Sequence, residues 1–468
     1  MTRRLLVVGG DAGGMTAAAQ ARRRATDDDL EVIAFERGRY TSYSACGIPY
    51  FVGGIVDEVD DLIARSPEEH RANGIDVRLE SEVVAIDIDA RTVTARGRES
   101  GAETVEPFDD LVIATGATPI RPDLPGIDAR GVHGVQHLGD GLDLRADVDA
   151  TGDGPVVVVG AGYVGLELAE ALHDRGRRVT IVEASEQPLD LLDPDMGKLV
   201  ADGIRGLGIE LVTDARVDAF DVDAGGRVRA VVAGDRTFAC NLVVLGLGVE
   251  PDVALARDAG IRIGPSGGVA TDARMATSVA GVWAAGDCVE CHHRVSNRPV
   301  AIALGTHANK QGRVVGINVT GGDTKFGGVI GTAVTKICAH EVARTGLNES
   351  EARDAGFEIA TATIESTTRA RYFPGSTPVT VKVVAERASG RLLGAQIVGR
   401  EGAAKRIDVL ATAIWNEMTV AEIEQLDLGY APPFSPVWDP VLVAARKAAT
   451  QCAIDAASTS GPRRTDDR

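Results

Sequence analysis

Cys46 is the residue whose neighbours most favour chemistry. It lies in the segment Ser42-Tyr43-Ser44-Ala45-Cys46-Gly47-Ile48-Pro49-Tyr50, ten residues after Glu36. Gly47 and the apolar turn after it predict a helix start, where the helix dipole would lower the pKa of the thiol. Thr41 and Phe51 occupy the positions five residues away, so no second cysteine is spaced for an internal disulfide. Cys46 would therefore cycle against a mixed disulfide, a persulfide or a sulfenic acid, the alternative being an inert buried cysteine.

A glycine-rich turn at 160–165 predicts a dinucleotide site. An apolar strand at 156–159 leads into Gly160-Ala161-Gly162-Tyr163-Val164-Gly165, and a helical stretch follows. Gly160 permits a tight turn, Gly162 admits a pyrophosphate to the backbone, and Gly165 permits close packing of helix and strand. The pyrophosphate would lie at the helix N-terminus, where free N–H groups favour negative charge.

Glu183 indicates which coenzyme the glycine-rich turn at 160–165 binds. It ends the next strand, 23 residues after Gly160. A carboxylate there would hold the ribose hydroxyls of NAD and repel the 2′-phosphate of NADP. No arginine occurs in the following Ala184-Ser185-Glu186-Gln187, so the expected coenzyme is NADH, with NADPH as the alternative.

A similar turn opens the chain, about 150 residues earlier, so the strand–glycines–helix unit is repeated. It reads Gly9-Gly10-Asp11-Ala12-Gly13-Gly14, and Glu36 ends the next strand. Asp11 replaces the middle glycine, where a carboxylate is unfavourable unless its side chain points away from a pyrophosphate. The expected ligand-binding residues of this turn are Gly9, Gly13, Gly14 and Glu36.

Two further strand ends support a flavin beside the first turn. The strand at 111–114 ends in Thr115-Gly116, and the strand at 282–285 ends in Gly286-Asp287. Asp287, aimed at the first nucleotide site, would bond the hydroxyls of a flavin ribityl chain. The Cys288-x-x-Cys291-His292 that follows spells a haem-attachment motif, but without an export signal a surface turn and no metal are expected.

The chain has the length for about three domains, at 468 residues. Short apolar strands alternate with helical stretches up to about residue 325, which predicts doubly wound parallel sheets. Longer strands at 379–385 and 392–398 and a helix at 403–416 predict a different, α+β domain at the end. The expected fold class is therefore α/β, with two Rossmann-like dinucleotide-binding domains and a C-terminal α+β domain. The parallel strands are expected at 5–8, 31–35, 111–114, 156–159, 179–182 and 242–245.

Composition limits the partners. The net charge of −19 argues against nucleic acid and anionic membranes, because phosphate recognition requires a basic surface. No apolar run reaches the 18 residues of a membrane span, and the N-terminus lacks the pattern of a signal peptide. With only six cysteines the chain has no disulfide framework, so a reducing cytoplasm is expected.

These motifs together resemble the pyridine nucleotide–disulfide oxidoreductases over about residues 1–450. The segment around Cys46 is similar to the single-cysteine branch, which contains coenzyme A-disulfide reductases, NADH oxidases, NADH peroxidases and persulfide or polysulfide reductases. The C-terminal segments resemble the dimerisation domain of the coenzyme A-disulfide reductases. These segments are Tyr372-Phe373-Pro374-Gly375, Gly402-Ala403-Ala404-Lys405-Arg406-Ile407-Asp408 and Tyr430-Ala431-Pro432-Pro433-Phe434-Ser435.

The resemblance implies FAD as the flavin, a homodimer with shared active sites, and a role in cell redox homeostasis. The implied domains are FAD-binding at 1–120 with 246–325, NAD(P)H-binding at 121–245 and dimerisation at 326–455, before a disordered tail at 456–468. Tyr372 and Tyr430 would approach the partner's cysteine and donate hydrogen bonds to a leaving thiolate. The implied substrate-binding residues are Ser42, Thr16, Gln20, Arg23 and Asn309.

The sequence leaves the electron acceptor open. Some coenzyme A-disulfide reductases carry Asn before the cysteine and Lys after the Tyr-Ala-Pro-Pro motif; here Ala45 and Trp438 stand there. The main hypothesis is reduction of coenzyme A disulfide or a similar small disulfide by NADH. The alternatives are an NADH oxidase or peroxidase, a persulfide or polysulfide reductase, and a non-enzymatic NADH-sensing flavoprotein.

Overall fold

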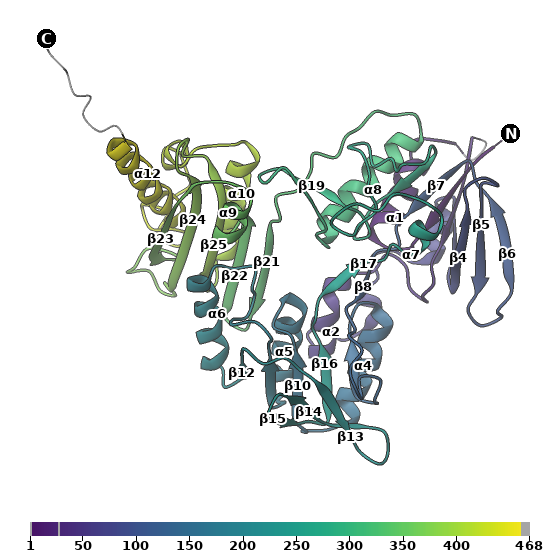
Figure 1. The fold of residues 1–468 in the computed structure, drawn as a ribbon, viewed down its shortest axis with the longest axis horizontal. Coiled ribbons are helices and arrows are strands. Elements are labelled where there is room, and N and C mark those ends of the chain that lie inside the picture. Colours follow the sequence, from purple (N-terminus) through teal and green to yellow (C-terminus); the bar gives the residue numbers. More distant parts are fainter. Residues whose placement is uncertain (1, 27–28, 460–468) are drawn as a thin grey trace, which may run out of the picture.

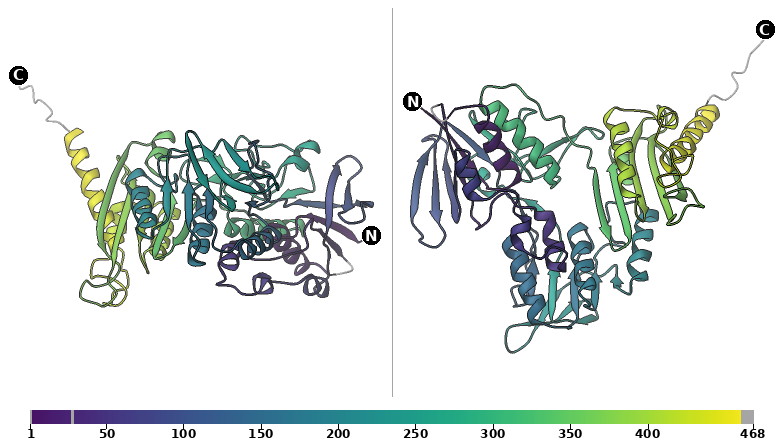
Figure 2. Two further views of the ribbon diagram at one scale, coloured as in Figure 1. Left: turned by 90° about the horizontal axis from the view of Figure 1, so that it is seen from below. Right: turned by 180° about the vertical axis from the view of Figure 1, so that it is seen from behind.

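The structure is a computed structural model that describes residues 2–26 and 29–459. Figure 1 shows three lobes, with the N-terminal lobe and the yellow C-terminal helix at opposite ends of the long axis. The middle lobe lies below the other two in this view, and Figure 2 shows the same arrangement from below and from behind. The middle lobe therefore contacts elements of both neighbours.

The first lobe contains a five-stranded parallel sheet in the order β18-β7-β1-β2-β3. Its last strand in sequence, β18, pairs with β7 in the register Val282↔Leu111, so this domain is assembled from two distant parts of the chain. The strands are β1 (Arg3–Val8), β2 (Leu30–Phe35), β3 (Ile75–Arg78), β7 (Asp110–Ile113) and β18 (Val282–Ala284).

Two helices cover this sheet and pack closely on each other. They are α1 (Ala12–Arg22) and α8 (Gly305–Val319). A Cβ built on Gly312 would lie 2.3 Å from the carbonyl oxygen of Gly13, so the α1–α8 contact requires glycine there. The lobe also contains α3 (Pro67–Ala72), η2 (Val59–Leu62), α7 (Ala254–Asp258), the antiparallel sheet β4 (Ser81–Asp87), β5 (Thr92–Gly97), β6 (Glu103–Pro107), and the hairpin β19 (Cys291–His293), β20 (Arg298–Val300).

The middle lobe repeats this architecture with a parallel sheet in the order β12-β11-β10-β16-β9. All four valines of β10 are buried, because apolar side chains cover both faces of the sheet. The strands are β9 (Val132–Gly134), β10 (Val156–Val159), β11 (Val179–Val182), β12 (Glu210–Val212) and β16 (Leu242–Leu245). The other elements are α4 (Leu138–Ala150), α5 (Tyr163–Asp174), α6 (Pro194–Gly206), β13 (Ala219–Val222), β14 (Val228–Ala233) and β15 (Arg236–Ala239).

Two connections join the first two lobes. The chain crosses between them through an antiparallel pair, β8 (Ala117–Pro119) and β17 (Val249–Pro251). The helix α2 (Ile48–Gly53), directly after Cys46, buries Ile48, Phe51 and Val52 in the core of the middle lobe. The segment that carries the cysteine therefore bridges the two dinucleotide-binding units.

The third lobe has an antiparallel sheet in the order β21-β22-β25-β24-β23. Its strands are β21 (Ala333–Ile337), β22 (His340–Gly346), β23 (Ile359–Thr367), β24 (Pro378–Glu386) and β25 (Leu392–Gly399). Its helices are α9 (Glu349–Asp354), η3 (Ala404–Arg406), α10 (Ile407–Trp415), α11 (Val420–Glu424) and α12 (Pro440–Thr459). This sheet confirms the predicted α+β domain, and the helix predicted at 403–416 is divided into η3 and α10.

The strands predicted from apolar runs are confirmed, each to within one or two residues of its ends. The tail prediction is wrong for 456–459, which form the end of α12, because the helix continues past the last apolar periodicity. Residues 460–468 lie outside the described residues. Among the described helices, none has both the length and the apolar character needed to cross a membrane.

Candidate active site

The first glycine turn lies between β1 and α1 and has no room for side chains. Gly9 has a φ of +114°, and a Cβ built there would lie 2.0 Å from the carbonyl oxygen of Ala114. A Cβ on Gly14 would lie 2.0 Å from the carbonyl oxygen of Gly9, and one on Gly13 would lie 3.0 Å from that of Ala285. These three positions therefore require glycine, and the N–H groups of the first turn of α1 fit a dinucleotide pyrophosphate.

Glu36, just after β2, braces this turn. Its Oε2 accepts the N–H of Gly10 at 2.8 Å, and its Oε1 accepts the N–H of Gly38 at 2.6 Å. Each oxygen keeps a second lone pair for a ribose hydroxyl. A cavity of about 430 Å³, lined in part by Tyr40 and Arg98, lies beside Glu36 and fits the adenosine end of FAD.

Asp11 is the N-cap residue of α1, and its side chain makes no capping bond. Burial, followed by the nearby Glu36 carboxylate, raises the pKa of its carboxyl to about 7, while the N–H groups of Ala12 and Tyr43 act in the opposite sense. At neutral pH the residue is thus partly protonated, which reduces the repulsion expected between a carboxylate and a pyrophosphate.

The second glycine turn, between β10 and α5, contains glycines with two different structural roles. A Cβ on Gly160, whose φ is +99°, would lie 2.4 Å from the carbonyl oxygen of Gly246, and one on Gly165 would lie 2.2 Å from that of Gly160. Around Gly162 the nearest atom to a built Cβ is 3.9 Å away, again the oxygen of Gly246. Gly160 and Gly165 are therefore required by the fold, whereas the free space at Gly162 fits an approaching ligand.

Glu183, after β11, makes the same contacts as Glu36. Its Oε2 accepts the N–H of Ala161 at 2.6 Å, and its Oε1 accepts the N–H of Ser185 at 2.7 Å. The carboxylate is thus held beside the second turn, where it fits the adenosine ribose of a pyridine nucleotide.

Thr115 and Gly116 lie where the chain crosses from the first lobe to the middle lobe. The Thr115 hydroxyl donates to the carbonyl oxygen of Asp252 at 2.6 Å, and the Asp252 N–H donates to the Gly116 carbonyl at 2.9 Å. These residues shape the strand end. Asp287 remains as the carboxylate of the neighbouring strand end, and burial raises its pKa. Gln311, from α8, fixes this corner by accepting the N–H of Gly286 at 2.7 Å.

Cys46 lies in the short helix η1 (Ala45–Gly47), and its free thiol is exposed. The predicted lowering of its pKa is wrong: partial burial, followed by the Glu167 and Asp287 carboxylates, raises the pKa above its usual value. The physical reason is that η1 is a single 3₁₀ turn with little dipole, while the carboxylates come from two different domains. The structure thus places the thiol among groups of both dinucleotide-binding units.

Glu167 is a site residue that the sequence reasoning missed. It lies one turn into α5, two residues after Gly165, and burial raises its pKa. Its Oε1 accepts the Thr335 hydroxyl of β21 at 2.9 Å. The available signal was a carboxylate near the start of the helix that follows a glycine turn, although its proximity to Cys46 depends on the packing of α2 against α5.

The predicted substrate residues fall into two groups. Thr16 and Asn309 come together, since the Thr16 hydroxyl donates to Asn309 Oδ1 at 2.8 Å. Gln20 lies on the same helix as Thr16, one turn further on, and Arg23 at its C-cap is exposed.

Ser42 lies apart from them and has a left-handed φ of 50°. Its hydroxyl oxygen is 2.9 Å from Nε2 of the buried His70. That contact and a backbone bond from its N–H to the Gly10 carbonyl hold Ser42 beside the first turn.

Tyr372 and Tyr430 lie together in the third lobe, where desolvation, followed by the Tyr372 phenol, raises the pKa of Tyr430. Tyr372 is 78% exposed and Tyr430 is 48% exposed, and Phe434 and Trp438 nearby are also largely exposed. The two tyrosines and Cys46 belong to different lobes of one chain. Exposed aromatic side chains of this kind fit a surface that meets a second subunit.

The expectation of a surface turn at the C-x-x-C-H motif is wrong. Cys288 is fully buried in the first core and Cys291 is 5% exposed, because β18 carries this segment into the domain interior. The amide of Gln311 donates to Cys291 Sγ at 2.9 Å. Within the described residues, no group of three or more His, Cys, Asp or Glu is arranged to hold a metal ion.

Comparison with known proteins defines the class. Residues 3–312 match the pyridine nucleotide-disulphide oxidoreductase family, and residues 332–440 match the dimerisation domain of that family. The chain belongs to this family and is an FAD-dependent enzyme that uses a pyridine nucleotide. The matches give no support to the non-enzymatic alternative.

Individual relatives differ in the acceptor that their names state. The chain is 36% identical over 456 residues to the NAD(P)H coenzyme A polysulfide/persulfide reductase of Pyrococcus horikoshii, covering 95% of this chain and 98% of that protein. It is 29% identical to a coenzyme A disulfide reductase of Staphylococcus aureus, covering 87% and 92% of the two chains. Other relatives of similar span are named NADH oxidase. The solved NAD-dependent persulfide reductase of A. fulgidus superposes with a TM-score of 0.92 at 38% identity, covering 96% of this chain and 83% of that one.

Proposed function

We propose that this enzyme uses NADH to reduce a low-molecular-weight disulfide, coenzyme A disulfide or a similar one, through Cys46. One observation carries the proposal: the exposed thiol of Cys46 lies at the junction of the two dinucleotide-binding units and has no second cysteine within its motif. The first glycine turn, Glu36 and Asp287 would hold FAD, and the second turn and Glu183 would hold NADH. Bound FAD supplies the transfer of two electrons from NADH to the thiol site.

The chemistry of Cys46 then follows from thiol–disulfide exchange. Its thiolate attacks one sulfur of the substrate disulfide, the substrate S–S bond breaks, and a mixed disulfide with Cys46 forms as the first thiolate leaves. Two electrons from NADH cleave the mixed disulfide, which releases the second thiolate and restores Cys46. One proton from solution and the proton equivalent carried by NADH convert the two thiolates to thiols.

Other residues would act on the sulfur that leaves the substrate disulfide. A hydrogen bond stabilises a leaving thiolate, and Tyr372 and Tyr430 of the partner subunit would donate it. Thr16, Gln20, Arg23, Ser42 and Asn309 would line the cleft for the acceptor. The active site would therefore be complete only in the homodimer, and the reducing cytoplasm is the compartment in which such a thiol works.

The test is an anaerobic NADH titration of the purified enzyme followed by rapid addition of coenzyme A disulfide, with the flavin spectrum recorded throughout. Fast reoxidation by the disulfide is expected for the wild type. Cys46→Ser should keep flavin reduction by NADH and lose disulfide turnover at least 1,000-fold, on the order of the loss of a covalent nucleophile. Cys338→Ser, which removes a thiol from the β21–β22 turn, is the matched control and should keep full turnover. Undiminished disulfide turnover in Cys46→Ser would refute the proposal.

A second candidate is an NADH oxidase or peroxidase, in which Cys46 would form a sulfenic acid, and the relatives of similar span that are named NADH oxidase support it. The third acceptor class is a persulfide or polysulfide. The titration separates them: reoxidation that occurs only on admission of air indicates the oxidase, and reoxidation by polysulfide alone indicates the sulfur reductase.

A further inference from the structure

The loop that follows Glu183 is attached to the dinucleotide site at Leu189, in its middle. The Leu189 N–H donates to the carbonyl oxygen of Ala161, inside the glycine turn, at 3.0 Å. Leu189 itself is buried and has a left-handed φ of 50°. A non-glycine residue in this conformation is held by its surroundings, so the position of the loop beside the turn is defined.

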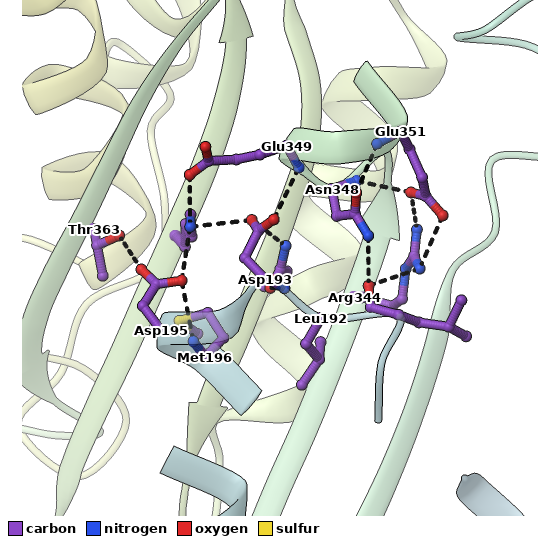
Figure 3. Close-up of polar contacts among 12 residues, drawn as sticks. Leu192, Asp193, Asp195, Met196, Arg344, Asn348, Glu349, Glu351 and Thr363 are labelled. Atoms are coloured by element: carbon purple, nitrogen blue, oxygen red, sulfur yellow. Dashed lines mark hydrogen bonds and ion pairs between the residues drawn. The ribbon is translucent and has the colours of Figure 1, made fainter. Parts of the chain in front are cut away.

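The far end of the loop enters a buried charge cluster on the dimerisation domain. Lys382 of β24 is 5% exposed and its Nζ lies 3.1 Å from Asp193 Oδ2, 2.7 Å from Asp195 Oδ1 and 2.8 Å from Glu349 Oε1. Figure 3 shows the carboxylates of Asp193, Asp195 and Glu349 converging on this one amino nitrogen. Asp193 and Asp195 belong to the dinucleotide-binding side, whereas Lys382 and Glu349 belong to the third lobe.

Hydrogen bonds satisfy the rest of the cluster. Asp193 accepts from Gln396 Nε2 at 2.7 Å and from the Glu349 N–H at 2.9 Å, and its own N–H donates to Gln396 Oε1 at 2.9 Å. The carbonyl oxygen of Leu191 accepts from Arg344 Nη1 at 2.9 Å. Every contact joins the loop to the dimerisation domain, so residues 191–196 are fixed to that domain.

A buried ion cluster of this kind contributes more to geometry than to stability. Desolvation offsets most of the Coulomb attraction between buried charges, so replacing them all with apolar groups is often neutral. Removing only the cation leaves carboxylates without their counter-ion, and the local arrangement must change. The cluster therefore determines where residues 191–196 lie relative to the dimerisation domain.

We propose that Lys382 is a positioning residue for the pyridine nucleotide. From the third lobe it fixes the far end of the 184–193 loop, and through that loop the position of Glu183 and the second glycine turn. The proposal rests on the proposed assignment of that turn to NADH and is independent of the electron acceptor. A second link supports it, since Lys336 of β21 pairs with Glu170 of α5 at 3.2 Å, across the same two lobes.

The test measures NAD⁺ binding by calorimetry on the FAD-loaded dimer, so that turnover is not needed. Lys382→Met should raise the Kd for NAD⁺ at least fivefold and leave FAD content and dimer mass unchanged. Lys382→Arg, which keeps the cation, should restore the Kd to within twofold. The matched control is Lys447→Met, because Lys447 is an exposed cation of the same lobe that donates to the Thr363 carbonyl at 2.8 Å, and its loss should leave the Kd unchanged.

Two further variants keep the outcome decisive. Asp195 is 48% exposed, so Asp195→Asn should fold even if Lys382→Met does not, and it should raise the Kd at least twofold. Gly162→Ala tests the site itself. If Gly162→Ala weakens NAD⁺ binding and the folded cluster variants leave it within twofold of wild type, the positioning role of Lys382 is refuted. If Gly162→Ala binds NAD⁺ as the wild type does, the site assignment falls and the positioning proposal falls with it.

Discussion

Glu36 and Glu183 hold the same position in two separate glycine turns. Each carboxylate accepts one N–H from the turn, that of Gly10 or of Ala161, and a second from the residue two positions after itself. Each carboxylate therefore holds the backbone of its own glycine turn through hydrogen bonds that do not depend on a bound ribose. The internal repeat in the sequence thus extends to individual hydrogen bonds.

Alanine substitutions should separate ligand approach from folding in the second turn. Gly162→Ala places its Cβ in free space, with the nearest atom 3.9 Å away, so the protein should fold normally and bind NADH about tenfold or more weakly. Gly165→Ala would place its Cβ 2.2 Å from the Gly160 carbonyl oxygen and should destabilise the domain. Thermal unfolding and NADH titration of both variants check this. Equal NADH affinity in wild type and Gly162→Ala would contradict it.

The coenzyme preference should depend on Glu183. Replacing this carboxylate and adding a cation, as in Glu183→Ala with Ala184→Arg, removes repulsion of the 2′-phosphate and supplies a partner for it. The ratio of kcat/KM for NADPH to that for NADH should rise by about 100-fold, corresponding to roughly 2.7 kcal/mol. Steady-state kinetics with both coenzymes measure the ratio. Ala184→Ser is the control, and a ratio unchanged in the double variant would count against Glu183 as the discriminating group.

Asp11 should make the stability of the FAD-free protein depend on pH. Its folded pKa of about 7 is raised above the usual aspartate value, so the folded chain binds a proton that the unfolded chain lacks. This contribution is complete below about pH 4 and is lost as the pH rises through 7. Between pH 6 and 8.5 the wild type should therefore lose about 1 to 1.5 kcal/mol more unfolding free energy than Asp11→Asn. Chemical denaturation at the two pH values measures the difference.

Asp235→Asn is the control for that experiment, because Asp235 is an exposed aspartate of the middle lobe. It should keep the pH dependence of the wild type. Identical pH slopes for the wild type and Asp11→Asn would show that the Asp11 carboxyl is already ionised in the folded chain at pH 6.

The two tyrosines should act on the active site of the other subunit. Tyr430→Phe, alone or with Tyr372→Phe, removes a proton donor and should lower kcat for the disulfide by about 10- to 100-fold without changing flavin reduction by NADH. Phe434→Leu, an exposed aromatic residue nearby, is the control.

Mixed dimers give the sharper check. A dimer of one Cys46→Ser subunit and one Tyr372→Phe/Tyr430→Phe subunit contains one intact site if the tyrosines serve the partner. Turnover of the mixed dimer should then approach half that of the wild type. Activity no higher than that of the two parent variants would place the tyrosines in another role.

Much of this enzyme was determined by its sequence alone. The apolar runs at 5–8 and 156–159 form parallel strands because both faces of their sheets are covered, and continuous apolar runs are typical of such strands. Gly9 and Gly160 each have a positive φ, a local backbone conformation that favours glycine, whereas the carbonyls that crowd them come from the distant residues Ala114 and Gly246. Motif spacing was therefore sufficient to predict the repeated turns and their flanking acids.

Only the tertiary structure decided the electrostatics of the site. The pKa of Cys46 is raised by partial burial and then by the carboxylates of Glu167 and Asp287, both of which lie more than 100 residues away in the sequence. The burial of Cys288 and the pairing of Lys382 with Asp193 depend equally on packing between distant segments. Local sequence determines backbone shape through sterics. Charge interactions depend on distance through space and on burial, and both are defined only once the lobes have packed together.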